Sequence, residues 1–370
     1  MRLATFNVEN MFERPKAMNL PGWEDGRQIL EDFSALNNLI AEPTYTAAVK
    51  AKLLEILGRN NGLLTQGVSD FIRLREYRGT LLRQPSGQPH EIAVNGRDEW
   101  VGWFELVPDQ INAVALLNTA RIMKLLNADI QCVIEADNRI ALTRFNSAVL
   151  HQVGGARYDQ VMLIDGNDDR GIDVGIMTRT GFPIASIASH VHDTDHTGVI
   201  FSRDCAEYTI GLPTGERLLL LVNHLKSKGF GSQASSNAKR LRQATRARAI
   251  YDQRRAEGAK LVAVLGDFNE VPDGAPVAPL LQAGSDLTDV MTHAAFVSDG
   301  RPGTHGNGTK SAKLDYILMS PELAARVTAG GIERRGVWGG THGTLFPHLP
   351  EITQEIEAAS DHAALFIDFS

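Results

Sequence analysis

The sequence predicts an α/β sandwich, and three observations support this prediction. Short apolar runs recur along the chain, helical stretches lie between some of them, and the runs end in polar or acidic residues. Open sheets place their chemistry at strand ends, so these polar residues are the first candidates for a functional site. The runs that we expect to form strands are residues 2–8, 130–134, 161–164, 174–177, 218–222, 261–265, 316–319 and 364–367.

Two stretches between the strands show the apolar spacing of a helix packed against a sheet. They cover residues 110–126 and 235–253. The apolar positions are Ile111, Val114, Leu117 and Leu125 in the first stretch and Leu241, Ala244, Ala249 and Ile250 in the second. Helical patterns also occur at residues 45–57 and 62–75.

Residues 14–108 differ from the rest of the chain. Their helical patterns lead into glycine and proline residues at 84–89 and then into a tryptophan-rich stretch at 99–105. We expect this segment to be an insertion or subdomain within a single domain that spans residues 1–370.

The tryptophan-rich stretch contains Trp100, Trp103 and Phe104. Aromatic rings can stack on bases, as they do in proteins that bind single strands. Aromatic residues that alternate with small ones more often anchor a hairpin to a core. We therefore expect these three side chains to be core anchors.

Composition excludes several classes of protein. The chain has 37 Lys and Arg against 44 Asp and Glu, a net charge of −7, which excludes a protein that coats nucleic acid through bulk charge. Cys132 and Cys205 are too few for a disulfide framework or a thiolate zinc site, and they fit a reducing compartment. No apolar run reaches the roughly 18 residues of a membrane span, and no export signal is evident. We expect a cytoplasmic protein without a membrane span.

Six separated segments place acceptor or acid/base groups at strand ends. Each alone is typical of a turn or a helix cap, because Asp, Asn and Ser side chains bond their own backbone. Together they include hard oxygen ligands suited to Mg²⁺ or Mn²⁺, and two histidines suited to proton transfer at a phosphodiester. The segments are residues 7–9, 133–135, 223–228, 266–269, 313–317 and 360–362.

The order of these motifs resembles the endonuclease/exonuclease/phosphatase superfamily, which includes pancreatic deoxyribonuclease, apurinic endonucleases and neutral sphingomyelinases. The resemblance covers residues 1–10 and 130–370, about two thirds of the chain. It implies a DNase I-like four-layer α/β sandwich, in which two mainly antiparallel sheets are flanked by helices. The helical patterns of residues 14–108, which the resemblance does not cover, predict in addition a helical insertion near the site entrance. The matching residues are 5–9, Glu135, 170–173, 223–226, 266–269, Asp315 and 360–362.

The resemblance also implies a metal site. Glu135 would be the principal ligand of Mg²⁺ or Mn²⁺, helped by Asn7, Glu9 and Asp361. Glu9 stands where many nucleases of the family have Asp, and its longer side chain would shift the metal or its surroundings.

The resemblance implies roles for five catalytic residues. Asp267 would position or deprotonate the attacking water, and Asn269 would orient that water and hold a phosphate oxygen. His362 would be held in one tautomer by Asp315, while His224 would stabilise or protonate the phosphoryl centre.

Four residues are expected to contact the substrate: Asn7, Arg170, Asn223 and Lys226. A guanidinium at Arg170 could fork onto a phosphate, and the alternative is an Arg–Asp pair that braces its loop. Lys226 beside His224 offers a positive charge to phosphate.

We therefore expect a metal-dependent phosphodiester hydrolase, in the first place a nuclease acting on DNA or RNA. The alternative keeps the chemistry and changes the substrate to a lipid headgroup, an inositol phosphate or another small phosphoester, because the motifs contact only the reacting phosphate and the metal. A third hypothesis is a non-catalytic binding protein. It would have lost a metal or water-positioning residue, and every such position here is filled.

Two further patterns have competing interpretations. Residues 223–260 contain ten Lys and Arg but two acids, which fits a solvated outer helix better than a nucleic-acid track, because the arginines spread around the helix. Histidines at 190, 192 and 196 around Asp195 suggest zinc, but their spacing does not match the known pattern. We expect a polar loop there.

Overall fold

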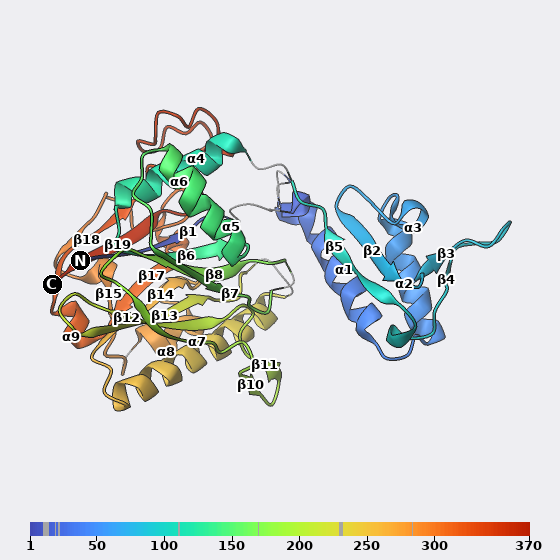
Figure 1. Ribbon diagram of the computed structural model, residues 1–370, viewed down its shortest axis with the longest axis horizontal. Coiled ribbons are helices and arrows are strands. Elements are labelled where there is room, and N and C mark those ends of the chain that lie inside the picture. The colour runs from blue at the N-terminus through green and yellow to red at the C-terminus, as the bar shows by residue number, and fades with distance from the viewer. Residues whose placement is uncertain are drawn as a thin grey trace. The chain divides into compact units, whose positions relative to one another are not determined.

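The structure is a computed structural model (Figure 1), which describes residues 1–9, 15–18, 20, 23–109, 112–168, 170–228, 232–282 and 284–370. It divides into two compact units, which are described separately below. Unit 1 comprises Met1–Phe12 and Ile111–Ser370, and unit 2 comprises Glu13–Gln110. We propose that the predicted insertion, residues 14–108, corresponds to unit 2 and interrupts a single domain.

The first sheet of unit 1 has seven strands among the described residues and is mainly antiparallel. Its parallel pairs are β1 with β6 and β16 with β18. The strands follow the order β16 (Phe296–Val297), β18 (Val327–Glu333), β19 (Ala364–Phe369), β1 (Arg2–Asn7), β6 (Ile130–Ala136), β8 (Asp173–Thr178) and β7 (Gln160–Ile164). Strands from the two ends of the chain, β1 and β19, are thus neighbours inside the sheet.

The second sheet has six described strands, and its one parallel pair is β13 with β14. The strands follow the order β15 (Thr288–Asp289), β17 (Asp315–Met319), β14 (Leu261–Asp267), β13 (Arg217–His224), β12 (Cys205–Gly211) and β9 (Ile184–Ala188). A separate hairpin pairs β10 (Thr194–Asp195) with β11 (Gly198–Val199).

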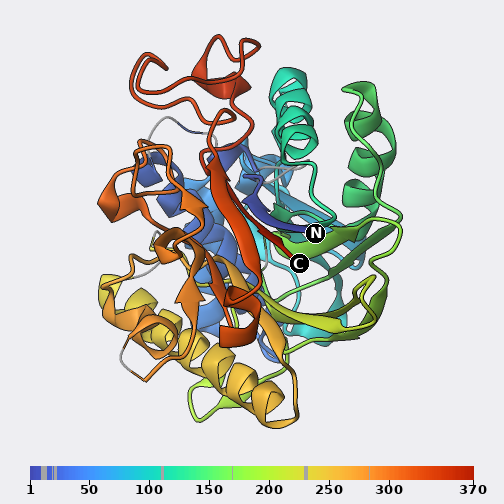
Figure 2. The ribbon, with the colours of Figure 1, turned by 90° about the vertical axis from the view of Figure 1, so that its left-hand side faces the viewer.

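Helices cover the outer face of each sheet. The first sheet is covered by α4 (Ala113–Leu126), α5 (Arg139–Arg144) and α6 (Leu150–Gln152), and the second by α7 (Gln233–Ala256) and α8 (Ala278–Leu281), while α9 (Pro321–Ala324) connects β17 to β18. Figure 2 shows the resulting layers, with α4 in teal on one side of the sheets and α7 in gold on the other. The predicted four-layer α/β sandwich is confirmed.

Strand β13 shows why the apolar runs are unbroken. Leu218, Leu220 and Val222 pack into the core between the two sheets, whereas Leu219 and Leu221 pack into the core beneath α7. Successive side chains of a strand point to opposite faces, so a strand covered on both faces is apolar throughout.

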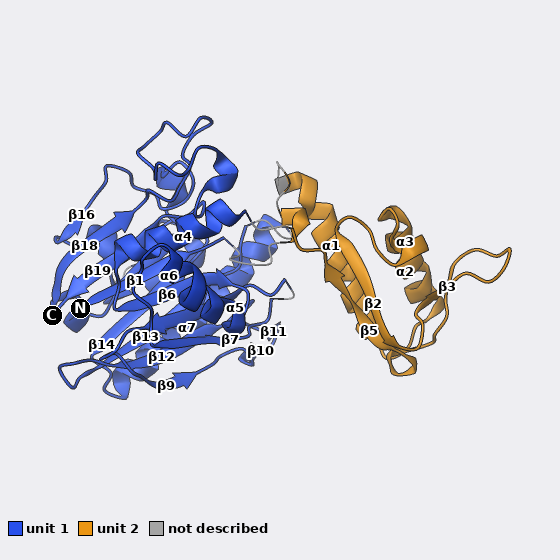
Figure 3. Ribbon diagram, turned by 45° about the horizontal axis from the view of Figure 1, so that its top comes forward, with its two compact units in different colours: residues 1–12, 111–370 blue, residues 13–110 orange. Residues whose placement is uncertain are grey.

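Unit 2 has an apolar core of its own. Figure 3 shows it in orange. It contains helices α1 (Trp23–Ala41), α2 (Ala47–Arg59) and α3 (Leu63–Gln66), a hairpin of β2 (Ile72–Arg78) with β5 (Val101–Leu106), and a short hairpin of β3 (Leu82–Arg83) with β4 (Glu91–Ile92). Trp100 and Phe104 lie in this core, as expected, but Trp103 is 42% exposed.

The helical prediction for residues 62–75 was wrong beyond Gln66. Gly67 has a φ of 70°, and its N–H bonds the carbonyl of Leu63, which ends the helix. Glycine adopts this left-handed conformation readily, so it commonly stops a helix. Residues Ile72–Arg78 then form a strand.

Two expectations from composition can be compared with the structure. Among the described residues, no helix is long and apolar enough to cross a membrane. Cys132 and Cys205 are both free and buried, as expected for residues that contribute to a core.

Gly266 provides a test of the pairing between β13 and β14. It has a φ of 121°, and a Cβ at this position would lie 2.0 Å from the carbonyl oxygen of Asn223. We expect Gly266→Ala to lower the free energy of unfolding by about 3 kcal/mol or more, because backbone strain and a clash combine. Urea unfolding followed by circular dichroism measures the change.

Gly258→Ala is the matched control. Gly258 also has a positive φ, 98°, but a Cβ there meets nothing within 4 Å. Its substitution should therefore cost only the backbone strain, about 1 kcal/mol. Equal losses in the two variants would contradict the proposed close approach at Gly266.

Candidate active site

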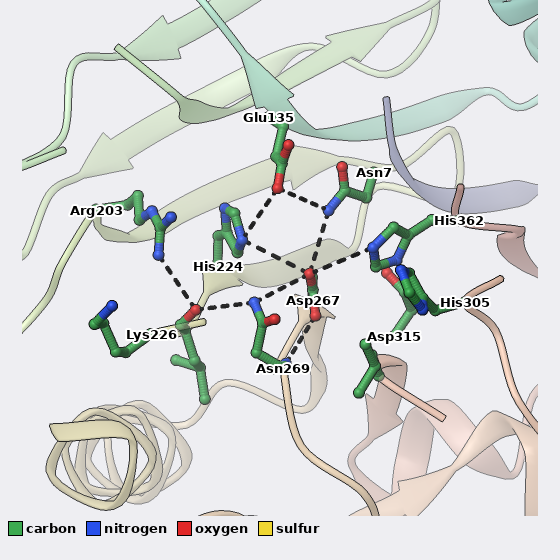
Figure 4. Close-up of polar contacts among 12 residues, drawn as sticks. Asn7, Glu135, Arg203, His224, Lys226, Asp267, Asn269, His305, Asp315 and His362 are labelled. Atoms are coloured by element: carbon green, nitrogen blue, oxygen red, sulfur yellow. Dashed lines mark hydrogen bonds and ion pairs between the residues drawn. The ribbon is translucent and has the colours of Figure 1, made fainter. Parts of the chain in front are cut away.

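The candidate site lies where strand ends of both sheets meet at one edge of the sandwich (Figure 4). The parallel pairs β1–β6 and β13–β14 bring four C-terminal strand ends to this edge. Strands β17 and β19 run antiparallel to β14 and β1, so their first residues reach the same edge. The strand ends contribute Asn7, Glu135, His224, Asp267 and Asp315, and His362 precedes β19.

Asp267 occupies the centre of the cluster. Its Oδ2 accepts hydrogen bonds from the side-chain Nδ2 of Asn7 and of Asn269, both at 3.2 Å. The same oxygen lies 3.6 Å from Nε2 of His224 and 3.9 Å from Nε2 of His362. Four side chains from separate segments therefore converge on one carboxylate oxygen.

Burial changes the acidity of Asp267. The residue is 2% exposed, and this burial raises the pKa of its carboxyl above the ordinary value, although the charge of His362 opposes the change. The backbone N–H of Asn269 donates to Oδ1 at 2.7 Å. A carboxylate with a raised pKa is a better proton acceptor than an exposed one.

His362 is oriented by Asp315. Its Nδ1 lies 2.8 Å from Oδ2 of Asp315, which also accepts a hydrogen bond from the Thr304 hydroxyl at 2.6 Å. Burial alone would lower the pKa of His362, but the charges of Asp315 and Asp361 outweigh burial and raise it well above its usual value. The imidazole therefore retains its proton, with Nε2 facing the cluster.

His224 has the opposite electrostatics. Its Nε2 lies 3.5 Å from Oε1 of Glu135, and its Nδ1 has no hydrogen-bond partner among the described residues. Burial, reinforced by the positive charges of Arg203 and Arg170, lowers the pKa of His224 well below its usual value. The two site histidines therefore differ in protonation, which suits them to different steps.

The expected metal ligands are connected through Asn7. Its Nδ2 donates to Oε1 of Glu135 at 3.3 Å, and its Oδ1 accepts the backbone N–H of Glu9 at 3.1 Å. The Glu9 carboxylate in turn accepts the backbone N–H of Asp361 at 3.0 Å. All four predicted ligands thus belong to one chain of contacts.

The backbone turns sharply at three of the site residues. Glu9, Glu135 and Asn269 have φ values of 53°, 66° and 52°. Non-glycine residues rarely adopt this left-handed conformation, and it costs of order 1–3 kcal/mol at each position. The conformation turns the chain out of the sheet at the points where the site side chains are needed.

The donor groups suit a divalent cation. Single donor atoms from Glu135, His224 and Asp267 lie within 4.8 Å of one another, and a second such group consists of His305, Asp361 and His362. A third group consists of Asp267, Asp315 and His362, so the three groups together contain four different carboxylates and three histidines. Carboxylate oxygens are the ligands that hard cations prefer. The residues present therefore fit the metal that the sequence predicts.

Arg170 and Asp168 form a forked ion pair. Two guanidinium nitrogens of Arg170 lie 2.8 Å from the two carboxylate oxygens of Asp168. The guanidinium of Arg170, which we expected to bind a phosphate, thus binds Asp168 in this structure. This is the alternative in which an Arg–Asp pair braces the loop. Arg203 binds the same carboxylate, with its Nε 2.8 Å from Oδ2.

Lys226 and Asn223 occupy different environments. Lys226 lies in the group of side chains around the cluster (Figure 4), and burial, together with Arg203 and Arg170, lowers its pKa to about 7. Asn223 is fully buried and donates to the carbonyl of Leu221. Side chains alternate along β13, so Asn223 and His224 point to opposite faces, and the structure does not bring Asn223 into the cluster.

Two nearby residues were missed in the sequence. His305 lies 3.2 Å from Oδ2 of Asp361, and its ring centroid is 4.7 Å from that of His362. Arg203 is fully buried and reaches the carbonyl of Leu225, which also accepts a hydrogen bond from Asn269. Site residues were sought at the ends of predicted strands. His305 lies in a glycine-rich loop, and Arg203 precedes a strand that was not predicted, so this signal could not find either residue.

The arginines of α7 are paired with acids. These pairs leave little free positive charge along the helix, which favours a solvated outer helix over a nucleic-acid track. The pairs are Arg240 with Glu270, Arg242 with Asp195, Arg246 with Asp193, Arg248 with Asp252, Arg254 with Glu207 and Arg255 with Glu322.

The histidine-rich segment belongs to the same charged network. Both ring nitrogens of His190 are taken, by Asp193 at 2.9 Å and by Glu207 at 2.7 Å. In the described part of the chain, the groups close enough to share a metal do not include His190. The loop prediction for this segment is only partly correct, because Thr194–Asp195 form strand β10 of a short hairpin.

Comparison with known proteins identifies the family. The sequence profile of a family described as the Endonuclease/Exonuclease/phosphatase family matches residues 95–329, more than half of the chain. The chain belongs to this family. The match confirms the resemblance seen in the motifs, and members of the family are phosphoester hydrolases that generally use divalent metals.

Solved structures of this family share the fold. A mannosyl-6-phosphatase from Bacteroides thetaiotaomicron is 16% identical, with a TM-score of 0.50 over 70% of this chain and 91% of that chain. Another endonuclease/exonuclease/phosphatase family protein from the same bacterium is also 16% identical, with a TM-score of 0.50 over 69% of this chain and 86% of that chain. Both similarities establish the DNase I-like fold. No curated protein matches the chain.

The buried Asp168 carboxylate provides a test of the framework beside the cluster. We expect Asp168→Asn to lower the free energy of unfolding by about 3 kcal/mol or more, because Arg203 would remain buried without a counter-charge. Chemical unfolding measures the loss. Glu216→Gln is the control, because the Glu216–Arg326 pair is partly exposed and should contribute far less.

The same pair predicts a pH dependence. Burial would raise the pKa of Asp168, but Arg203 and Arg170 hold it well below its usual value. A carboxyl with a lowered pKa in the folded state stabilises the protein above its unfolded pKa, about 3.9, and loses this contribution as the pH falls further. The difference between wild type and Asp168→Asn should therefore shrink below about pH 4, and a constant difference would contradict the assignment.

Proposed function

We propose that the protein is a divalent-metal-dependent phosphodiester hydrolase, with nucleic acid as its substrate. The observation that carries the proposal is the convergence of Asn7, His224, Asn269 and His362 on the carboxylate of Asp267. This cluster combines a buried base, a protonated imidazole and a set of hard oxygen donors. Each of the three promotes the attack of water on a phosphoester: the base activates the water, and the imidazolium and a bound metal stabilise the developing charge.

The residues of the chain divide the reaction between them. Asp267 accepts the proton of the attacking water, and the amides of Asn7 and Asn269 hold its carboxylate in position. His362 keeps its proton because Asp315 stabilises the imidazolium, and its positive charge offsets the charge that develops on the phosphoryl oxygens. His224, which is neutral, hydrogen-bonds a phosphoryl oxygen or the leaving group.

Glu135 is proposed as the principal metal ligand, with Asn7, Glu9 and Asp361 around it. A bound Mg²⁺ or Mn²⁺ ion would act as a Lewis acid that withdraws charge from the phosphate oxygens. The buried guanidinium of Arg203 adds positive charge near His224. Lys226 lies close by (Figure 4), and its pKa of about 7 leaves it partly protonated at neutral pH.

One observation favours a second candidate substrate. One of the two similar structures from Bacteroides thetaiotaomicron is named as a mannosyl-6-phosphatase, and its name describes activity on a small phosphoester. The paired arginines of α7 also provide no continuous track for a polyanion on that helix. A small phosphoester is therefore the alternative substrate, processed by the same residues.

The catalytic roles can be tested by single substitutions. We expect Asp267→Ala and His362→Ala each to lower turnover about a hundredfold or more, because each group acts directly at the reacting phosphate. The assay is hydrolysis of a chromogenic phosphodiester with Mg²⁺, Mn²⁺ or chelator. His192→Ala is the matched control, because this histidine is exposed and lies outside the cluster. Near-normal turnover in either site variant would refute its role.

A substrate panel distinguishes the two candidates. Plasmid DNA, single-stranded DNA, RNA, sphingomyelin, inositol phosphates and mannose 6-phosphate would be compared at equal metal concentration. We expect metal-dependent cleavage of a nucleic acid at the highest kcat/KM. Preference for a small phosphoester would support the alternative, and a protein that binds no metal and cleaves nothing would be a non-catalytic member of the family.

A further inference from the structure

The β2–β5 hairpin of unit 2 carries an exposed pair of aromatic side chains. Tyr77 and Trp103 stack with ring centroids 5.1 Å apart and an angle of 18° between their planes. Tyr77 is 71% exposed and Trp103 is 42% exposed. Single exposed aromatic residues are common, but two that stack on each other at the surface form a stack that a further ring can extend.

The strand register explains why this pair is outside the core. Leu74 pairs with Phe104 on the face that packs into unit 2, whereas Arg75 pairs with Trp103 on the opposite face. A β-bulge at Tyr77 interrupts the regular pairing, and Tyr77 still reaches the ring of Trp103. The core of unit 2 is therefore complete without these two rings.

Arginines surround the aromatic pair. Arg73 and Arg75 share a single acid, Glu105, at 3.4 and 2.8 Å. Arg78 is exposed, and the described part of the chain contains no ion-pair partner for it. This face thus has three guanidiniums against one carboxylate, in a protein with a net charge of −7.

We propose that the surface formed by Arg73, Arg75, Tyr77, Arg78 and Trp103, named here the aromatic face, binds single-stranded nucleic acid. A base stacks on the Tyr77–Trp103 pair, and the arginines contact the neighbouring phosphates. The strand is single because a base within a duplex has no free ring face to offer. This inference extends the proposed function, and it rests on that function for the hydrolysis of the bound strand.

The composition of the aromatic face favours this ligand over a protein or a lipid surface. A standard protein interface buries about 800 Å² on each partner around an apolar core, which is more than two stacked rings provide. Insertion into lipid requires a larger apolar area than one stacked pair provides. Alternation of planar rings and guanidiniums is the chemistry that proteins use for single strands.

Binding on unit 2 has a kinetic consequence for the whole chain. A strand held by one part of a chain has a raised effective concentration at every other part that its length can reach. Loss of the aromatic face should therefore raise KM for long single strands and leave kcat nearly unchanged. Hydrolysis of a small phosphodiester, which has no further nucleotides to bind the aromatic face, should be unaffected.

The experiment measures binding of a fluorescein-labelled 20-nucleotide single strand to the full chain in chelator, by fluorescence anisotropy. We expect Tyr77→Ala/Trp103→Ala to weaken binding about tenfold or more, because stacking is lost. Tyr77→Phe/Trp103→Phe should keep most of the affinity, because both rings remain. Ile140→Ala is the control, since Ile140 is also exposed, at 65%, but lies on unit 1.

Salt dependence tests the arginines separately. Arg75→Ala/Arg78→Ala should reduce the slope of log affinity against log salt concentration, because fewer phosphates are contacted. Arg335→Ala, whose guanidinium pairs with Glu333 on unit 1, should leave the slope unchanged. A slope that is equal in all three proteins would overturn the proposed phosphate contacts.

The remaining outcomes are also decisive. Equal affinity of wild type and the double alanine variant would overturn the inference, and equally tight binding of a duplex would overturn its single-strand part. Cleavage of the chromogenic phosphodiester is the separate readout for the proposed function. A wild-type protein that binds the strand but hydrolyses no phosphodiester would contradict the proposed function and would still support binding of a single strand by the aromatic face.

Discussion

The carboxylate of Asp267 is the constraint on which the site depends. A buried charge is costly unless polar groups surround it, and the groups around Asp267 come from β1, β13, the turn after β14 and the segment before β19. These elements belong to both sheets, so the carboxylate is satisfied only when the sandwich is fully closed. The candidate site can therefore form only when the core between the two sheets is correctly packed.

Backbone strain has a similar distribution. The described non-glycine residues with positive φ are Glu9, Asn127, Glu135 and Asn269. Asn127 follows α4, where its N–H bonds the carbonyl of Met123, so it is an ordinary helix cap. The other three lie in the candidate site, where β-sheet geometry ends and side chains must turn toward the cluster. The stability of the two sheets offsets this strain.

Much of the fold could be predicted from the sequence because its central strands are continuous apolar runs. Strand β18 was missed because Gly330 and Gly331 interrupt its pattern, and a Cβ at Gly331 would meet the ring of Phe366 at 2.7 Å. The site residues at strand ends were predictable because parallel strands end at one edge. Asn223 shows the limit of this reasoning. It lies at the end of a strand, as predicted, but side chains alternate between the two faces of a strand, so Asn223 points away from the cluster while His224 points toward it. Arg203 and His305, which contact residues of the candidate site, could not be predicted. Both lie in loops, and no local sequence pattern specifies the path of these loops.

The place of β1 between β6 and β19 determines when the candidate site can assemble during synthesis. Asn7 precedes the other site residues in the chain, but β19, which pairs with β1 throughout Arg2–Thr5, follows all of them. His362 arrives equally late. Unit 2, a contiguous stretch with its own core, can be ordered much earlier. A growing chain can therefore carry a formed unit 2 while the residues of its candidate site are still unassembled.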